Sequence, residues 1–269
     1  MKKVLLTTFV AGLCLSASAQ RINLNKAVNA AGKGVSAASF TNADAAKYAK
    51  EAVEWMDKNN KIAGPKDPYT IRLNKLFGKH KSQDGLSLNY KVYLVTDINA
   101  FACADGSVRV FSSLMDIMTD DELLSIIGHE IGHVKNEDSK DAMKNAYMKA
   151  AALDVASSAS NTAQQLTESQ LGKMANAMLD ATHSRKQESE ADTYAYDFMK
   201  ENGYNVVGSY TAFKKLALLS NTKAKTFEKM MSSHPDSDKR AETAKKKAEK
   251  DGLWKDPGTV SLPTSKLTK

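Results

Sequence analysis

Cysteine is scarce in this chain, whose 269 residues include only Cys14 and Cys103. Cys14 falls in a short N-terminal segment that resembles a removable signal, so a single cysteine would remain after processing. One cysteine cannot form a disulfide within a chain, which excludes a small fold held together by disulfides. A lipid attached to Cys14 is an alternative, but Leu13 disfavours it because the residue before a lipidated cysteine is usually small.

Long apolar runs are also missing. After residue 20, no stretch approaches the roughly 18 apolar residues that a membrane-spanning helix needs. Before it, Lys2 and Lys3 precede a mostly apolar segment, 4–15, and Ala17-Ser18-Ala19 fits a signal-peptidase site. We therefore predict a signal peptide over residues 1–19. The protein is then exported to the periplasm or the cell exterior, and association with a membrane surface stays open.

Acidic residues are outnumbered, and the formal net charge is +7, or +5 once Lys2 and Lys3 are removed. Much of the excess lies in the segment from Lys239 to Lys250. Glu242 and Glu249 interrupt this run, alanines space it, and no aromatic residues alternate with the lysines. This pattern is typical of a solvated helix face rather than of a nucleic-acid-binding surface. We expect no nucleic-acid partner.

The order of the patterns along the chain predicts a predominantly helical α+β protein. We expect a loose leader over 20–41, one folded domain over 42–250 and a flexible tail over 251–269. Helical spacing, capping boxes and breakers predict helices that begin at or near Asn42, Pro68, Thr119, Ser139, Ser184, Val206 and Pro235, with a break at 160–163 in the long fourth segment. Between the second and third helices, alternating β-branched and aromatic residues predict a strand over 90–97. A hairpin over 99–113 follows, turning at Asp105-Gly106.

The helix that begins after Thr119 contains the sequence HEIGH, in which His129 and His133 are four residues apart. Residues at i and i+4 lie on one face of a helix, so both rings can reach one metal ion. Glu130 is offset from them and suits contact with a metal-activated water. The alternative is two structural core histidines. A metal site is favoured, since Gly128 before the motif and Gly132 within it each cost about 1 kcal/mol in a helix.

A catalytic zinc site needs a third protein ligand. Glu188 and Asp192 are again four residues apart, on the helix that Ser184 caps. One carboxylate of such a pair can bind the metal while the other accepts the N–H of a ligand histidine. His80 and His183 are the other candidates, and we expect both to be surface histidines.

Three segments together resemble one family. HEIGH, then SRKQESEAD (184–192), then SSHPDSDKR (232–240) are similar in order and spacing to the HtpX and CAAX-prenyl-endopeptidase zinc metallopeptidases, family forty-eight of the metallopeptidases. The likeness covers about residues 67–250 and is greatest to the small exported bacterial branch, the LoiP/YggG type. It implies a zincin fold of the gluzincin kind, with a small antiparallel sheet or hairpin packed on the active-site helix. Unlike membrane-bound relatives, this chain has no spanning helices, which disfavours membrane-embedded or prenylated substrates.

The resemblance also implies a role for each site residue. His129, His133 and Glu188 would bind one Zn²⁺ per chain, Glu130 would be the general base, and Asp192 would support a ligand histidine. His234 matches the family's His-Pro histidine, which either stabilises the reaction intermediate or blocks the zinc at rest. Arg240 would orient its neighbours.

The implied function is a zinc-dependent endopeptidase of exported or misfolded polypeptides, serving protein quality control in the cell envelope. The alternative is a non-catalytic zinc-containing chaperone or adaptor with a closed site. The hairpin strand 107–112, with Val108 and Val110, is one candidate edge for pairing with substrate. The segment 100–104, which begins at Ala100 and follows Asn99, is the other. The oligomeric state stays open.

Replacement of the third ligand tests this assignment. Glu188→Ala should lower the zinc content of the purified protein well below one ion per chain, because two imidazoles alone hold zinc weakly. Elemental analysis after dialysis measures the ratio. An unchanged metal-to-protein ratio would remove Glu188 from the ligand set.

Overall fold

The structure is a computed structural model that describes residues 40–154, 167–222 and 225–263. It is a helical α+β domain, as predicted. Its elements are, in chain order, α2 (Asn42–Asn59), α3 (Pro68–Phe77), β1 (Ser82–Gln83), β2 (Leu86–Ser87), β3 (Asn89–Tyr93), β4 (Ala100–Ala102), β5 (Ser107–Phe111), α4 (Ser112–Ile117), α5 (Asp120–Lys135), α6 (Asp138–Asp154), α7 (Glu168–Leu179), α8 (Arg185–Glu201), α9 (Val207–Asn221), the 3₁₀ turn η1 (Lys225–Phe227), α10 (Glu228–Ser233) and α11 (Ser237–Lys250).

The helix starts that position the site lie where the sequence predicts them. Thr119 caps α5, and Glu122 bonds back to the Thr119 backbone in a complete capping box. Ser184 caps α8 in the same way with Gln187. Pro68 occupies the first turn of α3, where its missing N–H costs nothing. These caps fix the starting frames of α5 and α8, and so fix which faces carry the motif residues.

The three-stranded sheet has the order β3-β5-β4, which corrects two expectations. The hairpin β4–β5 is antiparallel and turns at Gly106, but β3 pairs with β5 in parallel, so the sheet is mixed. β5 is therefore the central strand and not an edge. Val108 and Val110 are fully buried in it, and their expected role in binding substrate is wrong. All five β5 residues are buried, as is usual for a strand covered on both faces. β4 is the edge.

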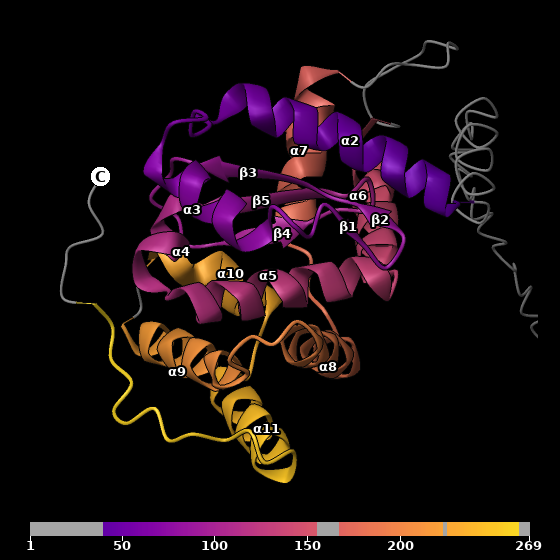
Figure 1. The fold of residues 1–269 in the computed structure, drawn as a ribbon. Coiled ribbons are helices and arrows are strands. Elements are labelled where there is room, and N and C mark those ends of the chain that lie inside the picture. Colours follow the sequence, from indigo (N-terminus) through magenta and orange to yellow (C-terminus); the bar gives the residue numbers. More distant parts are fainter. Residues whose placement is uncertain (1–39, 155–166, 223–224, 264–269) are drawn as a thin grey trace, which may run out of the picture.

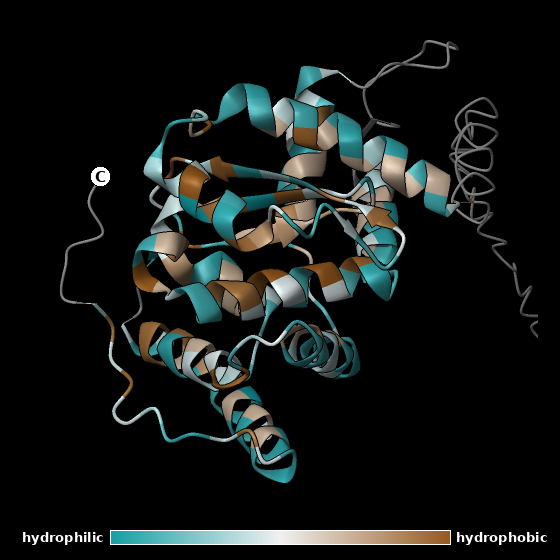
Figure 2. Cartoon of the chain, viewed as in Figure 1, coloured by the Kyte–Doolittle hydropathy of each residue, from teal (hydrophilic) through white to brown (hydrophobic). Residues whose placement is uncertain are grey.

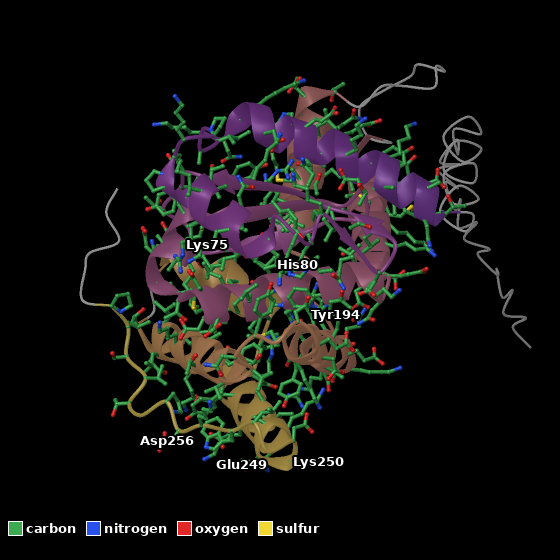
Figure 3. The ribbon with its side chains drawn as sticks, viewed as in Figure 1. Lys75, His80, Tyr194, Glu249, Lys250 and Asp256 are labelled. Carbon is green, nitrogen blue, oxygen red and sulfur yellow. The ribbon has the colours of Figure 1, made fainter. Side chains whose placement is uncertain are left out.

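The elements stack in layers around α5. Figure 1 shows α5 below the sheet, with α8 and α9 beneath it and α11 at the outer end. Helices α2, α6 and α7 pack together on the other side, where they share a second apolar cluster with Phe101 and Cys103. The hydropathy colouring separates brown strands and inner helix faces from the mostly teal α11 (Figure 2). Side chains at the end of α11, including Glu249 and Lys250, project outward (Figure 3).

Other predictions have mixed outcomes. The signal peptide, most of the leader and the break at 160–163 lie outside the described residues. The tail beyond Lys250 has no regular structure as far as residue 263, but Trp254 packs edge-on against Tyr210, so its first residues are anchored.

His80 is not a surface histidine. It is 3% exposed, and its Nε2 lies 2.7 Å from the Tyr204 hydroxyl.

A buried ionic cluster joins α2 to the sheet. The carboxylate of Asp57 accepts hydrogen bonds from Arg109, Lys91 and Tyr93 at 2.6–2.9 Å. Burial opposes the charge of Asp57, but these hydrogen bonds outweigh it and lower the pKa of Asp57 to about 2. Arg109 is 2% exposed, so its charge depends on Asp57 for compensation.

Asp57→Asn should lower the free energy of unfolding by about 2 kcal/mol at pH 7, since a shift of one pKa unit is worth about 1.4 kcal/mol. The folded-state pKa lies below the unfolded one. The stabilisation is therefore present above about pH 4 and is lost as the pH falls toward 2. Urea unfolding measured between pH 7 and pH 3 checks this, with exposed Glu242→Gln as control. A difference between wild type and variant that does not shrink below pH 4 would contradict it.

Candidate metal centre

The two histidines of the HEIGH motif converge inside the protein. His129 and His133 lie one turn apart on α5, are 3% and 2% exposed, and their Nε2 atoms are 3.0 Å apart. The i, i+4 spacing thus brings both rings to one point, as the sequence predicts. An exposed turn of helix would leave such rings to water, whereas here they are enclosed between the sheet and α8.

Carboxylates behind the rings fix which nitrogen carries the proton. Asp192 on α8 lies 2.9 Å from Nδ1 of His129, and Asp138 lies 2.9 Å from Nδ1 of His133. Each carboxylate accepts the Nδ1–H, which leaves a lone pair on each Nε2. Two lone pairs that face each other at 3.0 Å repel unless a proton or a metal ion lies between them. The pairing of Asp192 with His129 is the contact that the sequence predicts for this residue.

Glu188 adds an oxygen to the same point. Its Oε1 lies 3.3 Å from Nε2 of His133 and its Oε2 lies 3.6 Å from Nε2 of His129. Oε2 is also 2.7 Å from an Arg240 nitrogen, but the geometry is not that of a hydrogen bond, and the buried oxygen has no hydrogen-bond partner. Two imidazole nitrogens and a carboxylate oxygen that accepts no hydrogen bond are the donors of a three-ligand zinc site. The residues present therefore fit the metal.

The charges of the cluster suit a divalent cation. Burial, together with the nearby Arg240, lowers the pKa of His129 to about 3 and keeps this ligand neutral. Burial opposes ionisation of Glu188, but hydrogen bonds from His133 and His234 hold the pKa of this carboxyl well below its usual range. For His133, burial is outweighed by its bonds to Asp138 and Glu188, which raise its pKa to about 9. A metal ion bound at Nε2 of His133 would therefore take the place of a proton on that nitrogen.

Glu130 lies beside the donor atoms without joining them. It is 5% exposed, and its Oε1 is 3.5 Å from Nε2 of His234. Burial raises the pKa of Glu130, which moves the carboxyl toward the range in which a general base works best.

His234 follows α10 and reaches the same cluster. Its Nδ1 lies 2.9 Å from Oε1 of Glu188 and 3.3 Å from Nε2 of His129. One donor atom from each of these residues and from His133 lies within 4.8 Å of all the others. His234 is therefore adjacent to His129 and Glu188 and also lies beside Glu130.

Arg240 holds the carboxylates from behind. Its Nε and Nη2 donate to the two oxygens of Asp192 at 2.9 and 2.6 Å, and Nη1 pairs with Glu188. Its guanidinium also lies 4.3 Å from the centre of the Phe213 ring. This fork fixes Asp192, which in turn orients His129, as expected for a residue that positions its neighbours.

Two glycines let α8 approach α5. A Cβ built on Gly132 would lie 3.1 Å from Cα of Ala191, and one on Gly128 would lie 3.2 Å from the Phe198 ring. Ala191 lies between Glu188 and Asp192, so this contact sets the distance from the carboxylates to the histidines. The cost of the glycines in a helix is thus explained by the close approach of a second helix.

Sequence reasoning missed Asp138 and misplaced His183. Asp138 is the first residue of α6, and Gln187 also donates to it, at 2.7 Å. His183 is partly buried, and its ring stacks on His133 with centroids 3.9 Å apart. Its place one residue before the Ser184 cap was the available signal. Asn99 and Ala100 line the space beside Glu130 and His133, and their role in binding substrate stays a prediction.

The fold and this cluster define the class of a metal-dependent peptidase, with the HExxH helix and a later carboxylate as its core. The chain belongs to peptidase family M48, whose model matches residues 74–248. It is a metalloendopeptidase, a hydrolase of peptide bonds. None of the helices in the described ranges is long and apolar enough to cross a membrane.

Curated relatives agree. The chain is 38% identical to the metalloprotease YcaL of Escherichia coli K12 over 222 residues, which cover 82% of this chain and 86% of YcaL. It is 34% identical to the metalloprotease LoiP of the same organism, over 87% of this chain and 92% of LoiP. The mitochondrial metalloendopeptidase OMA1 of Arabidopsis thaliana is 27% identical over 57% of this chain and 30% of its own length.

Gly132→Ala should weaken both the fold and metal binding. Alanine gains about 1 kcal/mol of helix propensity, but overpacking costs about 1–3 kcal/mol and displaces α8 with Glu188. Urea unfolding and competition with a chromophoric chelator measure the two effects. Gly64→Ala, where the new Cβ meets nothing within 4 Å, is the control. Metal affinity equal to that of wild type would show that the contact does not set the ligand geometry.

Proposed function

We propose that this chain is a zinc-dependent endopeptidase that cleaves unfolded or misfolded polypeptides, in which His129, His133 and Glu188 hold one zinc ion. The observation that carries the proposal is the convergence of two Nε2 lone pairs and an unsatisfied Glu188 oxygen beside the buried Glu130. A zinc ion bound there lowers the pKa of a water and polarises a peptide carbonyl.

The residues of the chain supply the proton transfers. Glu130 accepts the proton of the attacking water, and its raised pKa makes it competent to return the proton to the leaving amine. His234 lies close enough to Glu130 to donate a hydrogen bond to the oxyanion that develops at the scissile carbonyl. Asp192, Asp138 and Arg240 keep the rings and Glu188 in place during both steps.

A closed site is the second candidate, and the position of His234 favours it. With Nδ1 2.9 Å from Glu188 and 3.3 Å from Nε2 of His129, His234 can act as a fourth protein ligand. A site closed in this way would be structural or inhibited at rest, and the protein would then hold clients without cutting them.

The outer side of the edge strand β4 carries backbone groups that can form hydrogen bonds with an extended substrate. Ladder bonds in an antiparallel pair alternate, and the bonds of Asn99 and Cys103 to β5 place the peptide groups of Ala100 and Ala102 on the outer side. Asn99 Oδ1 already accepts from the Ala100 N–H, and Ser139 donates to the Ala102 carbonyl. The remaining groups, the Ala100 carbonyl and the Ala102 N–H, can pair with an extended chain.

The N-terminal segment supports export. Lys2 and Lys3, the apolar segment 4–15 and Ala17-Ser18-Ala19 form a signal peptide, so the substrates are exported proteins and the role is quality control in the cell envelope. The periplasm and the cell exterior are the compartments that this signal allows.

Glu130→Gln tests the function. The variant should keep its metal but lose peptide hydrolysis by several orders of magnitude, because the amide cannot accept a proton. Cuts in a denatured protein substrate are mapped by mass spectrometry, with and without chelator, for wild type, Glu130→Gln and the surface control Glu190→Gln. Chelator-sensitive cutting by wild type and the control alone supports the proposal. If Glu130→Gln cuts as fast as wild type, Glu130 is not the general base. If wild-type protein that carries its full metal content cuts nothing, the closed site is favoured.

A further inference from the structure

Two pockets of very different size adjoin one another at the start of β4. The catalytic pocket lies beside Glu130, His133 and His234, and its volume is about 50 Å³. The distal pocket lies between α2, α7 and α10, and its volume is about 530 Å³. Asn99 and Leu179 line both pockets, so the two are neighbours that share part of their walls.

The small volume of the catalytic pocket limits what it can hold. A space of about 50 Å³ accommodates a few waters or a small side chain, since one water needs about 10–15 Å³ on this scale. Alanines such as Ala100 and Ala102 form part of its wall, and Met178 approaches Cys103 across it, at 3.6 Å between the sulfur atoms. Bulky side chains do not fit here.

The distal pocket is large enough for a bulky side chain, and its wall combines an apolar part with a polar and charged rim that includes Asn60, Asp97 and Lys229. Trp55 comes from α2, Tyr93 and Phe111 from the ends of strands β3 and β5, and Leu179 from α7. Its volume falls within the range of about 300–1,000 Å³ that ligand pockets occupy. Asn176 is exposed on α7 at the lining, so the pocket opens to solvent on that side.

One ion pair connects α7 and α10, which both line the distal pocket. Lys229 on α10 lies 3.1 Å from Asp180 at the end of α7, with side chains 45% and 56% exposed. Exposed pairs of this kind contribute little to stability, so this contact does not hold the walls closed against a ligand.

We infer that the distal pocket is a substrate subsite that binds a bulky apolar side chain, a few residues from the scissile bond. This rests on the proposed function and narrows its substrate class. A chain that extends along the Ala100–Ala102 edge continues past Asn99 into the distal pocket, because Asn99 directly precedes the strand and lines both spaces. The preferred substrates are extended segments with small residues at the cut and one large apolar residue at a fixed distance from it. Such segments are exposed in unfolded chains and buried in folded ones.

A peptide series tests the subsite. The probes are 12-residue peptides of Ala, Ser and Gly with a single Trp moved one position at a time, and a Trp-free parent. Wild type should cut at a constant distance from the Trp, at least about tenfold faster than it cuts the parent, because burial of a large apolar side chain is worth that much. Asn176→Trp fills the pocket from an exposed position and should abolish the preference. Lys173→Trp, one turn earlier on α7 and outside the lining, should keep it.

A binding measurement separates the pocket from the chemistry. Fluorescence anisotropy of labelled peptides on metal-loaded Glu130→Gln should show tighter binding of the Trp peptides, and Asn176→Trp or Ser232→Trp in that background should remove the difference. If the Trp peptides bind more tightly but wild type cuts none of them, the subsite is supported and the proposed peptidase activity is contradicted. The subsite is contradicted if the position and rate of cutting do not depend on where the Trp lies. It is also contradicted if the preference for Trp peptides persists in both pocket-filling variants.

Discussion

The contact between α5 and α8 is the constraint on which the site depends. The two histidines come from one helix and Glu188 from the other, so the distance between the helix axes decides whether the three donor atoms meet. Gly132 against Ala191 makes that distance short, and the neighbours of Ala191 in the chain include Glu188 and Asp192. One carboxylate thus reaches the cluster directly while the other reaches it through His129. The contact that packs α8 on α5 therefore also sets the positions of these two carboxylates relative to the histidines.

The buried charges around this contact are arranged in opposite pairs. Arg240 faces Asp192 and Glu188, and Asp138 faces His133, so the buried acids of the cluster have cationic or N–H partners. A carboxylate enclosed without such partners would take up a proton and lose its value as a ligand. The same enclosure raises the pKa of Glu130, whose oxygens face His234 instead of a guanidinium. Glu188, the proposed ligand, and Glu130, the proposed base, are therefore the same kind of side chain and differ through their neighbours.

Local patterns predicted the parts that one helix determines. The i, i+4 spacing placed His129 with His133 and Glu188 with Asp192, and the capping boxes at Thr119 and Ser184 set both helix starts. Features that need distant segments were not predictable. β5 became central because β3, from before the hairpin, pairs with it in parallel. Asp138 reaches His133 after a residue with positive φ, Glu137, whose turn has no sequence signature. The distal pocket combines segments from α2 to α10, which no local pattern relates.

Anomalous diffraction at the zinc edge, from crystals grown with zinc, tests the central claim most directly. The account predicts one strong peak between the two helices, with Nε2 of His129, Nε2 of His133 and a Glu188 oxygen each about 2.0–2.2 Å from it. A peak bound through Nδ1 of either ring, or a Glu188 carboxylate turned away from the ion, would contradict it.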